Sequence, residues 1–167
     1  RQDSLGDRMK RAEDCYRIYL PRRMPLIIRV DGRAFHSLTA GMIKPWDREF
    51  NRAMTEVALG LVAEIQGAKL AYIQSDEVSV LSTDYEHYEP QAWFDRNLQK
   101  VVSVSAACAT RHFLRFYPDK YALFDSRAFV LTKEEVCNYF IWRQQDAVRN
   151  SIQSLGQAHF SHRQLHG

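Results

Sequence analysis

The chain has 167 residues, of which 46% are hydrophobic and 26% are charged, a composition that is typical of one globular domain and excludes an intrinsically disordered chain. Its formal net charge of +3 is compatible with a polyanionic partner but does not require one. No apolar run approaches the roughly 20 residues that cross a bilayer. The N-terminal stretch is too charged for a secretory signal, so we expect a soluble, cytoplasmic protein without a membrane partner.

The three cysteines argue against a disulfide framework or a zinc site. Cys15, Cys108 and Cys137 lie far apart in the sequence, and no two of them form a CxxC pair. We therefore expect reduced thiols in the core.

The first half of the chain predicts a helix, a strand and a second helix. Apolar residues recur at helical spacing from a capped start at Ser4 until Pro21 interrupts the pattern. The apolar run 26–30 predicts a strand. A second helical stripe begins near Asp47 and ends at Gly67.

The second half predicts a hairpin, a helix, a strand and a last helix. The hairpin strands are 69–74 and 78–82, and the short segment 75–77 joins them in a tight turn. The elements after the hairpin are a helix over 91–116, a strand over 126–131, and a helix from Thr132 past Arg149 with a capping box completed by Glu135.

This order of elements predicts the ferredoxin-like βαββαβ arrangement of an α+β domain. A helical crossover leaves the first two strands parallel, and the third strand lies between them, antiparallel to both. Asp31 ends the first strand, whereas Asp76 and Glu77 lie in the hairpin, so these carboxylates should converge at one edge of the sheet. No repeat or linker divides the chain, and we expect a single domain over residues 1–167.

Converging carboxylates predict a site for a divalent cation. They cannot all remain ionised without a counter-charge, so either a pKa rises or a cation binds. Oxygen ligands select Mg²⁺ or Mn²⁺. Gly32 has no Cβ, so its carbonyl and the amides from Arg33 to His36 can approach an ion or a triphosphate closely. An Asp-Gly pair or a polar hairpin is by itself typical of a solvated turn, and the metal interpretation depends on their meeting at one edge.

The chain resembles the tRNA-histidine guanylyltransferase family and its tRNA-repairing relatives, the 3′-to-5′ nucleotide polymerases. The catalytic part of these enzymes is similar to a polymerase palm with flanking helices. The resemblance is carried, in the family's order, by the segments RVDGRAFHSLT, KPWD, YIQSDEVSVL, FDSRAFVL and NYFIWRQQDAVRNS. The form of the last segment is similar to the bacterial tRNA 5′-end repair branch.

The resemblance implies a metal site and a nucleotide site at the predicted edge. Asp31 and Asp76 would hold two Mg²⁺ ions together with the Gly32 carbonyl, and Glu77 would support that cluster as a third catalytic carboxylate. The nucleotide-binding set would be Asp31, Gly32, Arg33, Ala34, Phe35, His36, Lys44, Ser75 and Asp76. Without the resemblance, Lys44 is equally well a solvated loop charge, and Phe35 is equally well a core residue.

A basic set matches positions that the family places near the 5′ end and phosphates of the RNA. These residues are Arg29, Lys100, Arg127, Arg143, Arg149 and Asn150. Alternatives remain open for them: surface charge in general, an ion pair with Asp125 for Arg127, and an intramolecular ladder with Asp146 along the last helix.

As a function, the resemblance implies a Mg²⁺-dependent nucleotidyltransferase that adds nucleotides in the 3′-to-5′ direction to the 5′ end of tRNA, in 5′-end repair or in tRNA-histidine guanylylation. The 5′ end would be activated with ATP or GTP, or used as a triphosphate, before the 3′-hydroxyl of an incoming NTP attacks it. One alternative is a nucleotide cyclase on the same palm. Another is a noncatalytic RNA-binding module, which should expose aromatic residues on its central strands.

The resemblance further implies a homo-oligomer, namely a tetramer, and a longer chain in relatives, so we expect a further C-terminal segment to contribute to the site. Two sets of residues are interpreted as structural. A polar helix face is favoured over a metal site for His159, His162 and His166, and core or interface positions are favoured for Trp46, Trp93 and Trp142.

Overall fold

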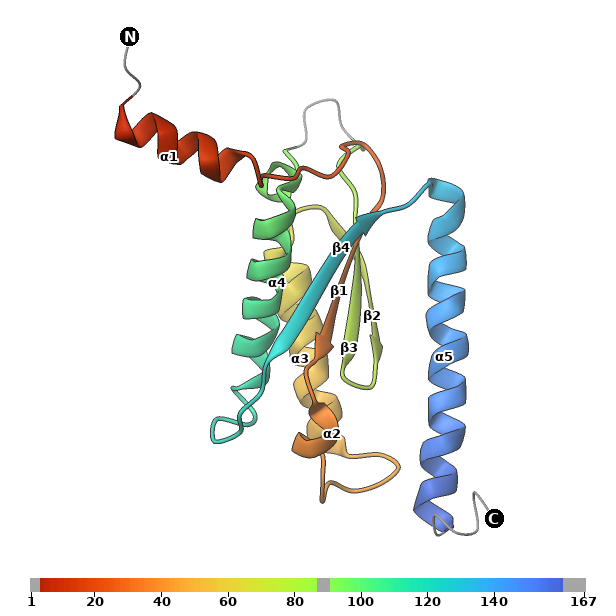
Figure 1. Cartoon of the computed structure of the whole chain (residues 1–167). Helices are drawn as coiled ribbons and strands as arrows, with labels where there is room; N and C mark the ends of the chain where they lie inside the picture. Colours follow the sequence, from red (N-terminus) through yellow and green to blue (C-terminus); the bar gives the residue numbers. More distant parts are fainter. Residues whose placement is uncertain (1–3, 87–90, 161–167) are drawn as a thin grey trace.

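The computed structural model describes residues 4–86 and 91–160. Its four strands form one antiparallel sheet in the order β2-β3-β1-β4 (Figure 1). β3 lies between β1 and β2 and is antiparallel to both, so the ferredoxin-like α+β prediction is confirmed. The strands are β1 (Leu26–Gly32), β2 (Ala68–Gln74), β3 (Glu77–Ser82) and β4 (Phe124–Val130).

Helices cover both faces of the sheet (Figure 1). α3 (Arg48–Glu64) and α4 (Leu98–Phe113) lie on one face, and α5 (Lys133–His159) runs along the other. The one-turn α2 (Phe35–Leu38), which the sequence pattern did not predict, follows β1, and α1 (Leu5–Asp14) projects away from the body. Within the described part of the chain, no helix combines the length and hydropathy that a bilayer crossing needs.

The core lies between the sheet and the pair α3 and α4. Strand alternation directs one set of β1 and β3 side chains to that face, where they are fully buried with Met54 and Phe113. This apolar set is Ile28, Val30, Val78 and Val80. The α5 face of the same two strands carries instead a polar set, consisting of Arg29, Asp31, Glu77 and Ser79.

The expected continuous helix over 91–116 is wrong, because a 3-10 turn, η1 (Trp93–Arg96), precedes α4. Three consecutive residues there have positive φ, namely Phe94, Asp95 and Arg96. This backbone turns the Arg96 guanidinium into the interior, where it donates to Asp84 at 2.7 Å and to the carbonyls of Pro21 and Met24, each also at 2.7 Å. This buried ion pair and the two hydrogen bonds to carbonyls hold the strained backbone in place.

The predicted N-terminal helix is also shorter than expected. α1 ends at Asp14, none of its side chains is buried, and the following chain pairs through Tyr19 with Asn97. The pairing with Asn97 needs an extended backbone, which overrides the local helical pattern.

Helix caps agree with the sequence at two positions and differ at a third. Ser4 caps α1, and Asp47 caps α3 by accepting a hydrogen bond from the Phe50 amide at 3.0 Å. Thr132 occupies the N-cap position of α5, but its side chain makes no capping hydrogen bond, so the expected capping box with Glu135 is wrong.

The three cysteines are free, as predicted, but their expected core positions are not all confirmed. Cys15 and Cys137 are exposed, and Cys108 is partly buried against the core. Among the tryptophans, Trp93 is a core residue, whereas Trp46 and Trp142 are exposed.

Candidate active site

The end of β1 and the β2–β3 hairpin meet at one edge of the sheet. Asp31 is the register partner of Glu77, and the Gly32 amide donates to the Asp76 carbonyl at 3.1 Å. The structure therefore brings together the two segments that carry the three carboxylates, as the sequence predicts, although about 45 residues separate them along the chain.

The carboxylates at this edge resist ionisation. Burial, together with the negative charge of Asp31, raises the pKa of Asp76 above its usual range. Burial also raises the pKa of Asp31, and the second cause is repulsion from Asp125, its register partner on β4. Asp125 is a fourth acidic neighbour that the sequence analysis treated only as a partner for Arg127, because the pairing of β1 with β4 is needed to place it beside Asp31.

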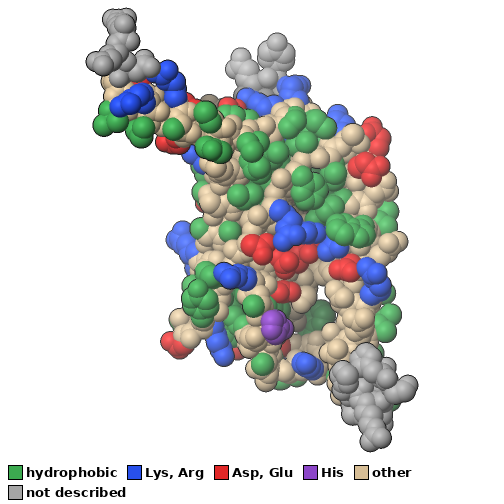
Figure 2. Space-filling model, viewed as in Figure 1, with side chains coloured by type: hydrophobic (Ala, Val, Ile, Leu, Met, Phe, Trp, Pro, Cys, Tyr) green, Lys and Arg blue, Asp and Glu red, His purple; other side chains and the backbone are tan. Residues whose placement is uncertain are grey.

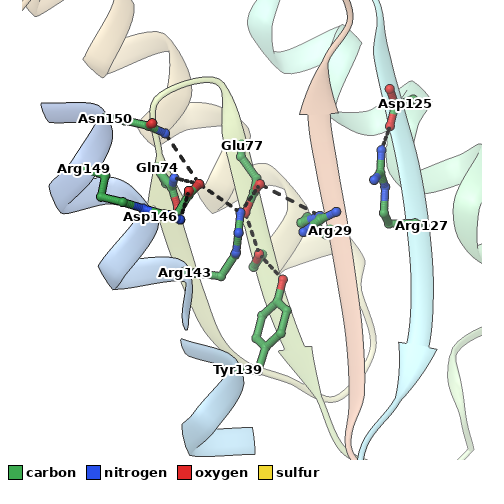
Figure 3. A network of polar contacts seen from close by, with 11 residues as sticks. Arg29, Gln74, Glu77, Asp125, Arg127, Tyr139, Arg143, Asp146, Arg149 and Asn150 are labelled. Carbon is green, nitrogen blue, oxygen red and sulfur yellow. Dashed lines mark hydrogen bonds and ion pairs between the residues drawn. The ribbon is translucent and has the colours of Figure 1, made fainter. Parts of the chain in front are cut away.

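Glu77 is held in a network on the α5 face of the sheet (Figure 3). Arg143 donates to its carboxylate at 2.9 Å, Arg29 approaches it at 3.9 Å, and the Ser79 hydroxyl lies at 3.4 Å and also contacts the Tyr139 hydroxyl at 2.7 Å. Burial raises the pKa of Glu77, whereas the charge of Arg143 opposes that shift. Glu77 is thus positioned by α5 beside the Asp31 carboxylate.

The polar face of α5 is an ion-pair ladder, as one of the two alternatives predicts. Asp146 accepts hydrogen bonds from Arg149 at 2.8 Å and from Gln74 of β2 at 2.9 Å, and Asn150 approaches it at 3.5 Å (Figure 3). These contacts lower the pKa of Asp146, with the Gln74 hydrogen bond as the largest cause. Arg149 and Asn150 remain exposed at the edge, so a role in guiding RNA stays a prediction.

The predicted nucleotide-binding residues follow β1 and flank the hairpin. A Cβ at Gly32 would lie 2.5 Å from the Phe35 ring, so only glycine allows the backbone to pass this close to the ring. Phe35 is buried among Phe50, Phe113 and Phe124, which makes it a core residue and removes its ring as a stacking platform.

The other predicted nucleotide contacts are solvent-facing. Arg33, Ala34 and His36 are exposed on and before α2, Lys44 is exposed in the loop after α2, and Ser75 is exposed in the hairpin. The Arg33 amide donates to the Leu123 carbonyl at 2.9 Å, so it is not available to a phosphate, and the expected backbone nest is reduced to the amides of Ala34, Phe35 and His36.

The remaining basic residues occupy different places. Arg127 pairs with Asp125 at 3.0 Å on the open part of the α5 face, where Figure 2 shows acidic and basic side chains side by side. Arg29 lies on the same face, and its guanidinium lies 5.9 Å from the Trp142 ring. Lys100 is exposed in the first turn of α4, at the other end of the sheet from Asp31, so the fold does not bring it to this edge.

A divalent ion fits the donor set at this edge. Asp31 and Asp76 supply hard carboxylate oxygens that lack a full complement of positive partners, and the Gly32 backbone is adjacent to both. Among the described residues, no group of three or more His, Cys, Asp or Glu side chains forms a ready-made metal cage. Two carboxylates and a carbonyl suit Mg²⁺, which usually keeps several waters and substrate phosphates as ligands.

His159 ends α5 without such a cluster, and His162 and His166 lie outside the described residues. A basic and aromatic pair that sequence reasoning missed, Lys120 and Tyr121, lines a cavity together with Arg33. Only their position in the connection before β4, and no motif, could have drawn attention to them.

Comparisons with known proteins agree with this geometry. A family model described as tRNAHis guanylyltransferase matches residues 6–132. Two solved structures of a bacterial tRNA(His) guanylyltransferase (Thg1)-like protein are 54% identical to the chain. The complex with ATP has a TM-score of 0.95 and covers 98% of this chain and 74% of that one, and the complex with GTP has a TM-score of 0.91 and covers 94% and 78%.

A curated relative, the tRNA(His) guanylyltransferase of Debaryomyces hansenii, is 31% identical over 140 residues, which cover 76% of this chain and 51% of that protein. The chain spans about half the length of the curated relatives that it matches.

Proposed function

This chain belongs to the tRNAHis guanylyltransferase family, and we propose that it is a nucleotidyltransferase that adds nucleotides in the 3′-to-5′ direction to the 5′ end of a tRNA. The observation that carries the proposal is the meeting of Asp31, at the end of β1, with Asp76 in the β2–β3 hairpin. Family membership gives the class of reaction, and this edge supplies the charge that phosphoryl transfer needs.

Mg²⁺ is the proposed cofactor, held as two ions by Asp31, Asp76 and the Gly32 carbonyl; Mn²⁺ also suits these ligands. When bound, the ions supply charge neutralisation for the attacking and departing oxygens. The hydrogen bond from Arg143 fixes the Glu77 side chain. Its proposed role is therefore to contribute negative charge near the ions and to keep the hairpin in position.

The exposed residues around the edge fit a triphosphate and its sugar. In the proposed reaction, the 3′-oxygen of an incoming NTP forms a bond to the activated 5′-phosphorus of the tRNA, the bond to the leaving AMP or pyrophosphate breaks, and the hydroxyl proton is lost. His36, Lys44 and Ser75 are exposed on segments next to the carboxylates, where they can hold phosphates. Catalysis of this kind depends on positioning and on charge stabilisation.

The substrates proposed for this chain are tRNA and ATP, GTP or another NTP. The bacterial Thg1-like relative is described in complex with ATP and with GTP, which supports nucleotide binding here. The branch similarity noted in the sequence favours 5′-end repair over a reaction restricted to tRNAHis.

A homo-oligomer, expected as a tetramer, is part of the proposal. Apolar side chains are exposed along α1 and the second half of α5, and patches of this kind mark protein interfaces. They are Leu5, Met9, Val148, Ile152 and Leu155. Size-exclusion chromatography with light scattering tests this state.

The function is tested by incubating the protein with 5′-truncated tRNA, labelled NTP and Mg²⁺. Wild type should extend the 5′ end, and Asp76→Ala should lose at least about 10²-fold in rate, by analogy with the loss of one strong electrostatic contact to the transition state. Asp14→Asn is the matched control, since this exposed aspartate of α1 makes only a surface ion pair. Equal extension by wild type and Asp76→Ala, or a cyclic nucleotide formed without RNA, would contradict the assignment.

A further inference from the structure

A cavity of about 460 Å³ opens next to the predicted metal site. One wall is Arg33 with residues of α2, and the other wall is Lys120 and Tyr121 from the connection between α4 and β4, which lies beside α2 in Figure 1. The hydrogen bond from the Arg33 amide to the Leu123 carbonyl, at 2.9 Å, ties the two walls together. A volume of this size accommodates one nucleotide unit.

The lining combines two cations with one aromatic ring. Arg33 and Lys120 are exposed, and neither has an acidic partner among residues 4–86 and 91–160. Tyr121 is 88% exposed, so its ring contributes little to packing in this chain. Cations that contact phosphates, next to a ring on which a base can stack, form the combination by which proteins bind single-stranded nucleic acid.

The order of the strands places this cavity on the opposite side of Asp31 from the hairpin. β3, with Ser75 and Asp76 before it, flanks one side of β1, and β4 flanks the other side. The connection that carries Lys120 and Tyr121 leads directly into β4, whereas Ser75 and Asp76 of the predicted NTP site lie on the β3 side. Arg33, which belongs to that predicted set as well as to the cavity lining, follows β1 between the two sides. A transfer reaction needs two substrates that reach the same centre from different directions.

We propose that this cavity binds the terminal nucleotide of the acceptor RNA, with its base stacked on Tyr121 and its phosphate between Arg33 and Lys120. The inference rests on the proposed function, which requires an RNA end beside Asp31. It adds a site for that end which is distinct from the basic positions on β1, β4, α4 and α5. The cavity recognises one nucleotide unit. We assign that nucleotide to the RNA strand and not to a free NTP.

The test measures binding without catalysis, in EDTA, with 5′-truncated tRNA labelled with a fluorophore. Tyr121→Ala should weaken binding about tenfold, the usual effect of losing one base–aromatic stack, and Tyr121→Phe should stay within about twofold of wild type. Lys120→Ala should weaken binding and lower the salt dependence by about one phosphate contact. Tyr16→Ala is the matched control, because this tyrosine is also highly exposed and lies next to α1.

A second arm separates the two sources of a nucleotide. Affinity for a fluorescent ATP or GTP analogue in Mg²⁺ should be the same for wild type, Lys120→Ala and Tyr121→Ala. The proposal is overturned if Tyr121→Ala binds RNA as wild type does, or if only NTP binding weakens. Because Tyr121 is exposed, both variants should unfold at the wild-type temperature, so a loss of binding reports on the cavity.

Failure of the proposed function gives a different pattern. Wild type would then fail to extend the tRNA, or Asp76→Ala would extend it equally, while the effect of Tyr121→Ala on RNA binding would still support the cavity site. The opposite result is extension that depends on Asp76 together with RNA binding that does not change in Tyr121→Ala. It would support the proposed function and reject the cavity site.

Discussion

Arg143 Nη1 donates to Glu77 Oε2 across 2.9 Å, and this contact joins α5 to the end of β3 that carries the predicted metal site. Both side chains are nearly inaccessible to solvent, and the Arg143 guanidinium also lies 3.6 Å from the Trp142 ring centre. The pair therefore couples the placement of a helix to the charge balance of the candidate active site.

We predict that Arg143→Met destabilises the protein by about 3–5 kcal/mol, because it leaves the Glu77 carboxylate buried without its main partner. Urea denaturation at pH 7.5 measures the change. The double variant Arg143→Met with Glu77→Leu should regain most of this stability, because two apolar groups replace the charged pair. It should not regain nucleotide transfer activity. An Arg143→Met protein as stable as wild type would show that the ion pair contributes little.

We predict that Asp76→Asn is more stable than wild type in EDTA at pH 7.5, by about 1 kcal/mol. The folded pKa of Asp76 is raised, so protonation favours the folded state, and the ionised form costs stability above that pKa. The difference should shrink as the pH falls through the raised folded pKa towards the unfolded value near 3.8.

The same pair of proteins tests the metal. Mg²⁺ should raise the unfolding temperature of wild type, because an ion that binds only the folded state stabilises it by mass action, and should leave Asp76→Asn almost unchanged. Differential scanning fluorimetry over a Mg²⁺ series measures both responses. An equal response of the two proteins would place the ions elsewhere.

The sequence predicts the strand order and the meeting of Asp31 with Asp76, because a helical crossover followed by a hairpin leaves few topologies. Asp47 is likewise predictable as the cap of α3, since its partner is three residues away. Contacts between segments that are distant in the sequence cannot be predicted from any local sequence pattern. Arg143 finds Glu77 across 66 residues, and Tyr121 reaches the cavity only because β4 returns beside β1.

The failed predictions have the same physical origin. The helix expected over 91–116 is interrupted because Arg96 turns inward to Asp84, an interaction worth more than the local helical preference. The chain after Asp14 leaves the helical pattern because Tyr19 pairs with Asn97. Propensity is a weak prior wherever a buried ion pair or a strand bridge competes with it.

We predict that His112 makes folding less favourable at mildly acidic pH. Burial and the positive charges of Arg115 and Arg111 lower its pKa, and its Nδ1 atom is buried without a hydrogen-bond partner among the described residues. The unfolded chain takes up a proton near pH 6.5, so stability is complete above that pH and declines below it towards the lower folded pKa.

His112→Gln should remove this part of the pH dependence. The free energy of unfolding, measured by urea at pH 7.5 and 5.5, should fall less for the variant than for wild type. Other titrating groups contribute equally to both proteins, so the difference isolates His112. Parallel pH profiles would show that the imidazole is free to ionise in the folded protein.

Two glycines with positive φ allow strain and steric clash to be separated. Gly41 has φ of 88° and open space around the position of a Cβ, whereas Gly67 has φ of 78° and a Cβ there would lie 2.3 Å from the Thr83 carbonyl oxygen. The Gly67 carbonyl also accepts a hydrogen bond from the Thr83 amide at 3.0 Å. The clash therefore cannot be relieved without separating the start of β2 from the end of β3.

We predict that Gly41→Ala costs about 1 kcal/mol, the price of a left-handed alanine, and that Gly67→Ala costs about 3 kcal/mol, because overpacking adds to the same strain. Urea unfolding of the two variants measures the difference. The Gly67→Ala protein should also lose amide protection at Thr83 in hydrogen exchange, while Gly41→Ala should keep it. Equal destabilisation by the two substitutions would mean that the β2–β3 ladder yields to the extra methyl group, and that the hairpin carrying Asp76 is less rigidly anchored than these contacts indicate.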